Sequence, residues 1–284
     1  MTTKTADNLG YTAQEIRDRM AISTAVFDLD GRIGAEQIAA VRQAGITRIE
    51  VCGLPAPRHF DYNDRAQVSE IVSACRSQGV EIVSMHGPGV LYPSADEDVR
   101  KSAVAEALVA ARVAEEMGAG VMVCHFGTDE QSERTIIEML EGLEGSKLRL
   151  ADENGQELAD YMALADRVGS DQFGMIVDVG HTRDGDGVNP FVVKDRARGT
   201  MAQCGERLIH VHLHDFIETD HIAPLDGNLQ WAEIFAAFRD IDYQGLFMFE
   251  PLYPAGQREQ SPEYVIRKTA EFPDAFVERY GSPA

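Results

Sequence analysis

Four residues that end or interrupt apolar runs have the chemistry of a divalent-metal site: Glu153, Asp178, His212 and Glu250. A charge at the end of an apolar run is costly unless it is paired or coordinated. Three carboxylates and one imidazole form a mixed oxygen and nitrogen donor set, which suits Mn²⁺, Mg²⁺, Co²⁺ or Zn²⁺. We therefore expect these four residues to bind one divalent metal ion, with Mn²⁺ as the first choice.

The histidines share one kind of position. Each lies at or near the C-terminal half of an expected strand or in the loop that follows it, and none falls in an expected helix. They are His59, His86, His125, His181, His210, His212, His214 and His221. One histidine in such a place is usually structural, but eight of them favour a reactive rim at one end of the fold. For His210 and His214 a structural role remains equally open, and a salt bridge explains Glu50 as well as a site does.

Eight short apolar runs must position these side chains. They cover residues 23–28, 47–53, 81–87, 120–127, 147–153, 174–180, 208–215 and 245–251. Segments with apolar residues at helical spacing separate them, and several end in glycine, as Gly45, Gly79, Gly118 and Gly145 do. Runs without strict alternation indicate strands that are buried on both faces. Eight strand–helix units predict a single (β/α)8 TIM barrel, with a doubly wound open sheet as the alternative.

Length and composition limit the domain organisation, the localisation and the partners of the protein. We expect residues 1–284 to form one TIM-barrel domain, with 1–21 as an N-terminal extension or helix. The polar N-terminus, the four scattered cysteines and the lack of a long apolar segment predict a cytoplasmic protein without a membrane partner. The net charge of −21 disfavours nucleic acid as a partner, because phosphate backbones are also negative.

A set of ordered motifs carries a resemblance to a known family. The motifs are His86-Gly87-Pro88, His125-Phe126-Gly127, Glu153-Asn154, Asp178-Val179-Gly180-His181, His212-Leu213-His214-Asp215 and His221-Ile222-Ala223-Pro224, followed by Gly227, Trp231 and Glu250. In this order, from about Ala21 to Phe276, the chain resembles the sugar phosphate isomerase/epimerase superfamily, the xylose-isomerase-like TIM barrels that include endonuclease IV.

The resemblance implies an activity and a role for each residue. The family's metal ligands fall on Glu153, Asp178, His212 and Glu250, and its substrate-binding positions on His181, His86, His125 and His221. Glu153 and Glu250 become the catalytic pair that exchanges a proton with carbon. The implied enzyme is a metal-dependent isomerase or epimerase of a small sugar or keto-sugar. It acts through an enediolate, because a metal on the carbonyl makes the neighbouring C–H more acidic.

Departures from the family keep other functions open. Ala159 and Glu218 stand where ketose 3-epimerases carry a glutamate and an arginine. Loss of a β-hydroxyl from the same enediolate would make a dehydratase or lyase of a keto-sugar, a cyclitol or a 3-keto-C-glycoside. A nuclease like endonuclease IV would use the same histidines, although Thr219 replaces an expected aspartate. A non-catalytic sugar-binding barrel is a further alternative, and a homo-oligomer or a partner subunit is compatible with each of them.

Overall fold

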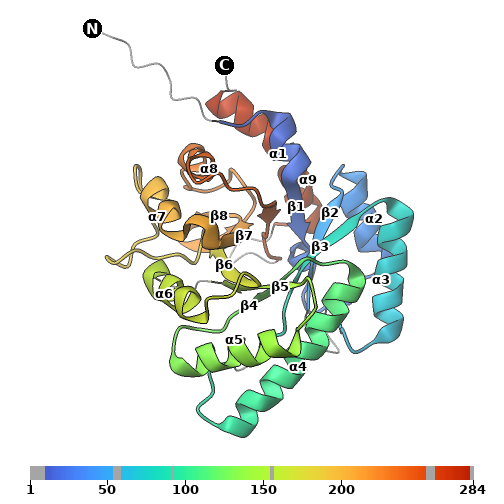
Figure 1. Ribbon diagram of the computed structural model, residues 1–284. Helices are drawn as coiled ribbons and strands as arrows, with labels where there is room; N and C mark the ends of the chain where they lie inside the picture. The colour runs from blue at the N-terminus through green and yellow to red at the C-terminus, as the bar shows by residue number, and fades with distance from the viewer. Residues whose placement is uncertain (1–9, 54–58, 91, 154–156, 254–259, 282–284) are drawn as a thin grey trace.

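The computed structural model describes residues 10–53, 59–90, 92–153, 157–253 and 260–281. Eight parallel strands close into a barrel in the order β1-β10-β7-β6-β5-β4-β3-β2 (Figure 1). They are β1 (Met20–Ser23), β2 (Arg48–Cys52), β3 (Glu81–His86), β4 (Val121–Cys124), β5 (Arg149–Glu153), β6 (Phe173–Asp178), β7 (Leu208–Leu213) and β10 (Phe247–Phe249). The prediction of a (β/α)8 TIM barrel is confirmed, and the open sheet is excluded.

Helices surround this barrel (Figure 1). They are α1 (Ala13–Arg19), α2 (Ala35–Gln43), α3 (Arg65–Gln78), α4 (Glu97–Met117), α5 (Glu130–Gly142), α6 (Leu158–Val168), α7 (Ala197–Cys204), α8 (Trp231–Asp240) and α9 (Pro262–Tyr280). Aspartate side chains cap the N-termini of α3, α4 and α5 by accepting backbone N–H groups. Gly79 and Gly118 end α3 and α4 with positive φ, as the sequence predicted.

The prediction for the first strand was wrong. We expected it at 23–28, but β1 is Met20–Ser23 and Thr24–Val26 form a 3₁₀ turn. The expected N-terminal helix exists as α1, yet Met20 and Ala21, which were assigned to the extension, belong to β1. The register explains this: Met20–Ile22 pair with Phe247–Phe249 of β10, so these apolar residues close the barrel. All four residues of β1 are buried.

A short antiparallel hairpin follows β7 and was not predicted. It consists of β8 (Asp215–Ile217) and β9 (Thr219–Ile222). Asp215 holds the segment that leads from this hairpin to α8: its carboxylate accepts the backbone N–H groups of Phe216 and Leu229 and the indole N–H of Trp231, at 2.8, 3.1 and 2.8 Å. The hairpin carries His221.

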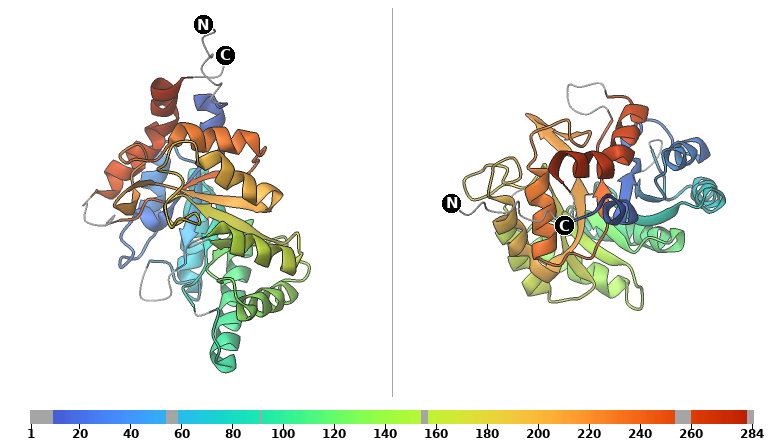
Figure 2. Two further views of the ribbon diagram at one scale, coloured as in Figure 1. Left: turned by 90° about the vertical axis from the view of Figure 1, so that its left-hand side faces the viewer. Right: turned by 90° about the horizontal axis from the view of Figure 1, so that it is seen from above.

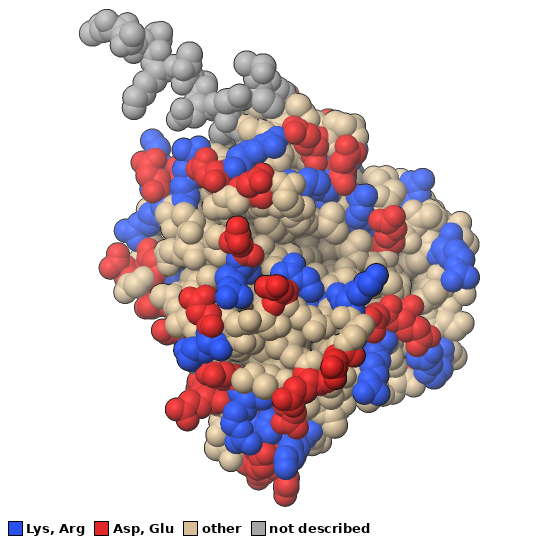
Figure 3. All heavy atoms as spheres, viewed as in Figure 1, with Lys and Arg blue, Asp and Glu red and all other residues tan. Residues whose placement is uncertain are grey.

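The first and last helices that the structure describes pack together on the outside of the barrel. Helices α1 and α9 lie side by side (Figure 2), and Arg17 of α1 pairs with Asp274 of α9 at 2.7 Å. The face drawn in Figure 3 carries acidic and basic side chains mixed together, without a broad basic area. Among the described residues, no helix combines the length and the apolar character that a membrane span needs.

Candidate metal centre

The C-terminal ends of neighbouring strands bring four potential ligands together. Glu153 ends β5, Asp178 ends β6, His212 lies near the end of β7 and Glu250 directly follows β10. Asp178 and His212 are register partners, so they lie at one level of the barrel. One ligand atom from each of the four residues lies within 4.8 Å of the others, and all four residues are buried.

His212 lies at the centre of this group. Its Nδ1 is 2.9 Å from Glu250 Oε2, 3.5 Å from Glu153 Oε2 and 4.0 Å from Asp178 Oδ2. Burial opposes the charged form of the ring, but the carboxylates of Glu250, Glu50 and Glu153 outweigh it and raise the pKa of His212 well above its usual value. Without a metal, a proton on this imidazole therefore compensates the surrounding negative charge.

Hydrogen bonds orient the carboxylate of Asp178. Its Oδ1 accepts the backbone N–H groups of Gly180 and His181, both at 2.7 Å. His214 Nε2 lies 3.0 Å from each carboxylate oxygen, while its Nδ1 accepts the backbone N–H of His221 at 2.8 Å. Because the ionised carboxylate of Asp178 can only accept, the Nε2–H of His214 is the donor of this hydrogen bond. His214 is therefore a positioning group and not a ligand in this arrangement.

Imidazoles surround Glu153. His86 Nε2 and His125 Nε2 each lie 3.4 Å from its Oε2, and His181 Nδ1 lies 3.2 Å from Oε1. Burial raises the pKa of Glu153, but the charge of His212 and hydrogen bonds from the neighbouring imidazoles outweigh that effect and hold the pKa well below its usual value. Glu153 is therefore a carboxylate at neutral pH, as a proton acceptor or a metal ligand has to be.

The β8–β9 hairpin adds a further group. His221 Nδ1 donates to the carbonyl oxygen of Glu250 at 2.8 Å, and its Nε2 lies 3.1 Å from His181 Nε2. Asp220 Oδ2 lies 3.3 Å from the same nitrogen of His181. Burial lowers the pKa of His181, but the hydrogen bonds that its ring donates to Asp220 and Glu153 reverse this and raise the pKa to about 11.

The donor set fits a divalent cation. Bonds of about 2.0–2.2 Å to a common ion leave ligand atoms roughly 3–4.5 Å apart, which is the spacing seen here. Two of the atoms that face the centre, Glu153 Oε2 and His212 Nδ1, are buried and make no aligned hydrogen bond with any described residue. A cation between them would satisfy both. Two adjoining sets, His86-His125-Glu153 and Asp178-His181-His221, also have metal-like spacing.

The four histidines predicted to contact substrate differ in the exposure of their side chains. The side chains of His125, His181 and His86 are 49%, 29% and 18% exposed, so they face the open side of the centre. His221 is buried beside Glu250. All four lie around the centre, although a contact with substrate stays a prediction for each of them.

Two histidines lie on the expected strand and loop but do not reach the centre. His59 is fully buried and bonds Thr24 Oγ1 and the carbonyl oxygen of Asp28, both at 3.1 Å, which is a structural role. His210 points into the barrel below the centre, 3.2 Å from Glu50 Oε2. Ala159 and Glu218, the departures from the 3-epimerase pattern, lie on α6 and in the β8–β9 turn, and both are exposed.

Sequence reasoning left two participants without a role. Glu50 was left open between a site residue and a salt bridge, and Asp220 was assigned no role. Asp220 directly precedes His221 in the sequence, and this adjacency was a weak indication that Asp220 lies near the site. The contact between Glu50 and the strand-seven histidines joins residues 160 positions apart, so no local pattern indicates it.

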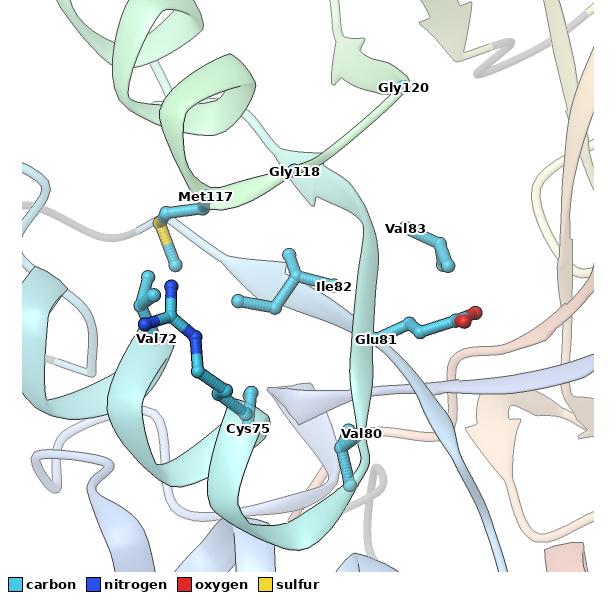
Figure 4. Close-up of a pocket in the computed structure, with 10 residues that line it drawn as sticks. Val72, Cys75, Val80, Glu81, Ile82, Val83, Met117, Gly118 and Gly120 are labelled. Carbon is cyan, nitrogen blue, oxygen red and sulfur yellow. The ribbon is translucent and has the colours of Figure 1, made fainter.

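A separate hollow opens at the opposite end of the barrel, where β3 and β4 begin. Its volume is about 490 Å³, and Figure 4 shows its lining of mostly apolar side chains between α3 and α4, among them Val72, Ile82 and Met117. Among the described residues that line this hollow there is no histidine, and Glu81 is the one carboxylate. It therefore has no part in the metal centre.

Comparison with known families adds a match over most of the chain. Residues 38–273 match the family described as "Xylose isomerase-like TIM barrel". A D-psicose 3-epimerase of Enterocloster bolteae is 31% identical over 101 residues, which are 36% of this chain and 29% of that protein. An uncharacterized protein of Sinorhizobium fredii, y4fM, is 30% identical over 92 residues, 32% of this chain and 27% of that protein. The chain thus aligns with less than a third of the length of either relative.

Solved structures share the whole fold at low identity. A D-psicose 3-epimerase from Clostridium cellulolyticum, solved with D-tagatose, has a TM-score of 0.69 at 16% identity, and the match covers 93% of this chain and 99% of that one. An L-ribulose 3-epimerase has a TM-score of 0.72 at 16% identity, over 92% and 95% of the two chains. At such identities the likeness establishes the shared barrel.

Proposed function

The chain belongs to the family of xylose isomerase-like TIM barrels, and from this premise we propose that it is a divalent-metal-dependent isomerase or epimerase of a small sugar or keto-sugar. The observation that carries the proposal is the convergence of Glu153, Asp178, His212 and Glu250, whose ligand atoms lie within 4.8 Å of one another. The psicose, tagatose and ribulose in the names of its relative and structural neighbours support a ketose or a related sugar as the substrate class.

The proposed cofactor is one Mn²⁺, with Mg²⁺, Co²⁺ or Zn²⁺ as alternatives, because the donor set contains oxygen and imidazole nitrogen without thiolate. A cation held by these residues would polarise a carbonyl oxygen and stabilise the negative charge that develops when the neighbouring carbon loses its proton.

The two glutamates would move that proton. Both reach the same point: Glu250 Oε2 and Glu153 Oε2 lie 2.9 and 3.5 Å from His212 Nδ1, from different sides of the barrel. Two carboxylates on opposite faces of a substrate carbon allow epimerisation, because one removes the proton and the other returns it. A single carboxylate that returns the proton to the neighbouring carbon gives isomerisation instead.

The more exposed imidazoles would hold the substrate. His86, His125 and His181 lie beside Glu153 and are partly exposed, so each can donate or accept a hydrogen bond with a sugar hydroxyl. The exposed Ala159 and Glu218 supply no equivalent of the glutamate and arginine of ketose 3-epimerases. We therefore expect a sugar whose other hydroxyls are bound differently from those of D-psicose.

Metal analysis followed by a substrate screen tests this function. We expect about one divalent ion per chain in protein purified without chelators, and metal-dependent interconversion of a ketose or an aldose in a panel of four- to six-carbon sugars. Product of unchanged mass identifies isomerisation or epimerisation, whereas loss of water or of an aglycone identifies a lyase. Protein that binds no divalent cation, even after soaking, would refute the proposal.

A further inference from the structure

The carboxylate of Glu50 lies inside the barrel beneath the proposed metal centre and is fully buried. It extends from β2, and two groups from other strands meet one of its oxygens. Ser84 Oγ of β3 donates to Glu50 Oε2 at 2.8 Å, and His210 Nε2 of β7 lies 3.2 Å from that oxygen. A buried carboxylate is costly unless its charge is compensated. These neighbours hold Oε2 and leave Oε1 facing a third group.

That third group is His212. Its Nε2 lies 3.1 Å from Glu50 Oε1, and its Nδ1 lies 2.9 Å from Glu250 Oε2. The ring therefore lies between a carboxylate below and the proposed metal ligands above. Among the described residues, Glu50 Oε1 and His212 Nε2 make no aligned hydrogen bond with any group, although they lie 3.1 Å from each other. Their mutual contact is thus the interaction through which both buried atoms can be satisfied.

We propose that Glu50 is a positioning residue that keeps a proton on His212 Nε2 and so directs the lone pair of Nδ1 towards the cation. This inference rests on the proposed function, because it requires a metal at the centre. A neutral imidazole has one proton, and the hydrogen bond of one nitrogen decides whether the other can be a ligand. A carboxylate partner also raises the basicity of the ligating nitrogen.

The anchoring of Glu50 makes it suited to this role. Ser84 is its register partner on the next strand, and Ser84 and His210 both restrain Oε2. Because one oxygen is held from two sides, the other has a defined position under the imidazole ring. The arrangement connects β2 with β7 across the interior of the barrel, so barrel closure sets the orientation of the ligand.

A direct role of Glu50 as a metal ligand would place the proton of His212 on the other ring nitrogen. Glu50, His210 and His212 are also close enough to hold a cation themselves. Such a cation would take the lone pair of His212 Nε2 and leave the proton on Nδ1. The location of the proton on His212 therefore separates a positioning role of Glu50 from a direct ligand role.

Metal titration of stripped protein is the first test. We expect Glu50→Gln to weaken Mn²⁺ binding, measured by calorimetry, by about 10–100-fold, the usual effect of losing a partner of a ligating histidine. Asp152→Asn is the matched control, because Asp152 is equally buried on β5 but bonds the backbone of Phe126 and no proposed ligand. Its Mn²⁺ affinity should equal that of the wild type.

Ser84→Ala keeps the test decisive if Glu50→Gln does not fold. It leaves Glu50 in place and removes only the hydroxyl that restrains it, so Mn²⁺ affinity should fall by less than in Glu50→Gln but measurably. Wild-type affinity in the folded Glu50 variant, or in Ser84→Ala where that variant does not fold, would overturn the inference while leaving the proposed function intact. A wild-type chain that binds no Mn²⁺ would instead refute the proposed function itself.

The second test reads the proton directly. In Zn²⁺-loaded protein labelled with ¹⁵N at histidine, we expect the His212 ring to show its proton on Nε2 and its metal on Nδ1. In Zn²⁺-loaded Glu50→Gln this Nε2–H signal should weaken or exchange faster with water, because the carboxylate acceptor is gone. A proton on Nδ1 of His212 in the wild type would overturn the inference.

Discussion

Four imidazoles of the centre approach Glu153. His86, His125 and His212 approach its Oε2 at 3.4–3.5 Å, and His181 approaches Oε1. An imidazole on each side keeps this carboxylate charged in spite of its burial. Replacing one carboxylate oxygen of Glu153 by an amide nitrogen would therefore disturb several interactions of the centre with almost no change in side-chain volume.

We expect Glu153→Gln to abolish turnover while the barrel stays folded, because the amide is nearly isosteric but can neither accept the substrate proton nor bind a cation well. The loss of kcat should be at least about 10²–10⁴-fold, the usual contribution of a general base. Circular dichroism checks the fold. Glu141→Gln, at an exposed position on α5, is the control and should keep full activity. Full activity of Glu153→Gln would refute the assignment of the base.

Metal-free protein should lose stability as the pH rises. Burial opposes the charged form of His86 and of His181, yet their acidic neighbours raise the pKa values to about 9 and about 11. A raised pKa means that the folded state holds the proton more tightly than the unfolded state, where the pKa is about 6.5. The stabilisation is therefore complete below about pH 6.5 and is lost as the pH rises through the folded-state values.

Thermal unfolding of stripped and metal-loaded protein between pH 6 and pH 10 measures this effect. The Tm of the stripped protein should fall over this range. The loaded protein should lose less, because a cation replaces the proton as the partner of the carboxylates. A stripped protein whose Tm is constant or rises over the range would contradict the assignment of charged imidazoles to the centre.

At the scale of elements, the turn after β6 leaves no room for a side chain. A Cβ on Gly180 would lie 2.2 Å from His214 Cε1 and 2.8 Å from Asp220 Cβ. Such contacts require His214 or the hairpin to move. Since His214 bonds the carboxylate of Asp178, the close approach of this turn to the β8–β9 hairpin is a condition for the geometry of the centre.

Gly180→Ala should therefore lower stability by about 1–3 kcal/mol and weaken Mn²⁺ binding, because the partner of Asp178 is displaced. Urea unfolding and metal titration measure the two effects. Gly185→Ala, in the same loop and with no heavy atom within 4 Å of the added Cβ, should change neither. Equal behaviour of the two variants would show that His214 does not position Asp178.

At the scale of the whole molecule, charge separates the proposed enzyme from the nuclease of its family. The chain carries 47 acidic and 26 basic residues, a net charge of −21, and the face in Figure 3 mixes the two signs. Non-specific affinity for DNA comes from Lys and Arg that neutralise phosphates. We therefore expect this surface to repel a duplex, although the candidate centre and the two sets that adjoin it could together hold more than one metal ion.

We expect no binding to, and no cleavage of, a duplex with an abasic site at physiological salt, even when the protein is loaded with Zn²⁺ or Mn²⁺. Fluorescence anisotropy measures the binding, and a denaturing gel detects nicks in the strand. Metal-dependent nicking that Glu153→Gln eliminates would favour the nuclease alternative over the sugar enzyme.

The amino-acid sequence determined the barrel and predicted which residues meet at the candidate metal centre. Eight apolar runs separated by helical segments allow few topologies, and parallel strands bring their C-terminal ends to one edge. Glu153, Asp178 and His212 could therefore be expected to meet there with Glu250 before any distance was known. Their catalytic, metal-binding and substrate-binding roles remain predictions.

Tertiary structure alone decided what each histidine contacts. His59 contacts Thr24 and Asp28, His214 contacts Asp178, and His210 contacts Glu50. The start of β1 was likewise set by its pairing with β10, and the partner of His181 by a hairpin that the sequence did not reveal. The physical reason is the same in each case. These contacts join residues from distant parts of the chain, so they depend on barrel closure and strand register, which local spacing does not encode.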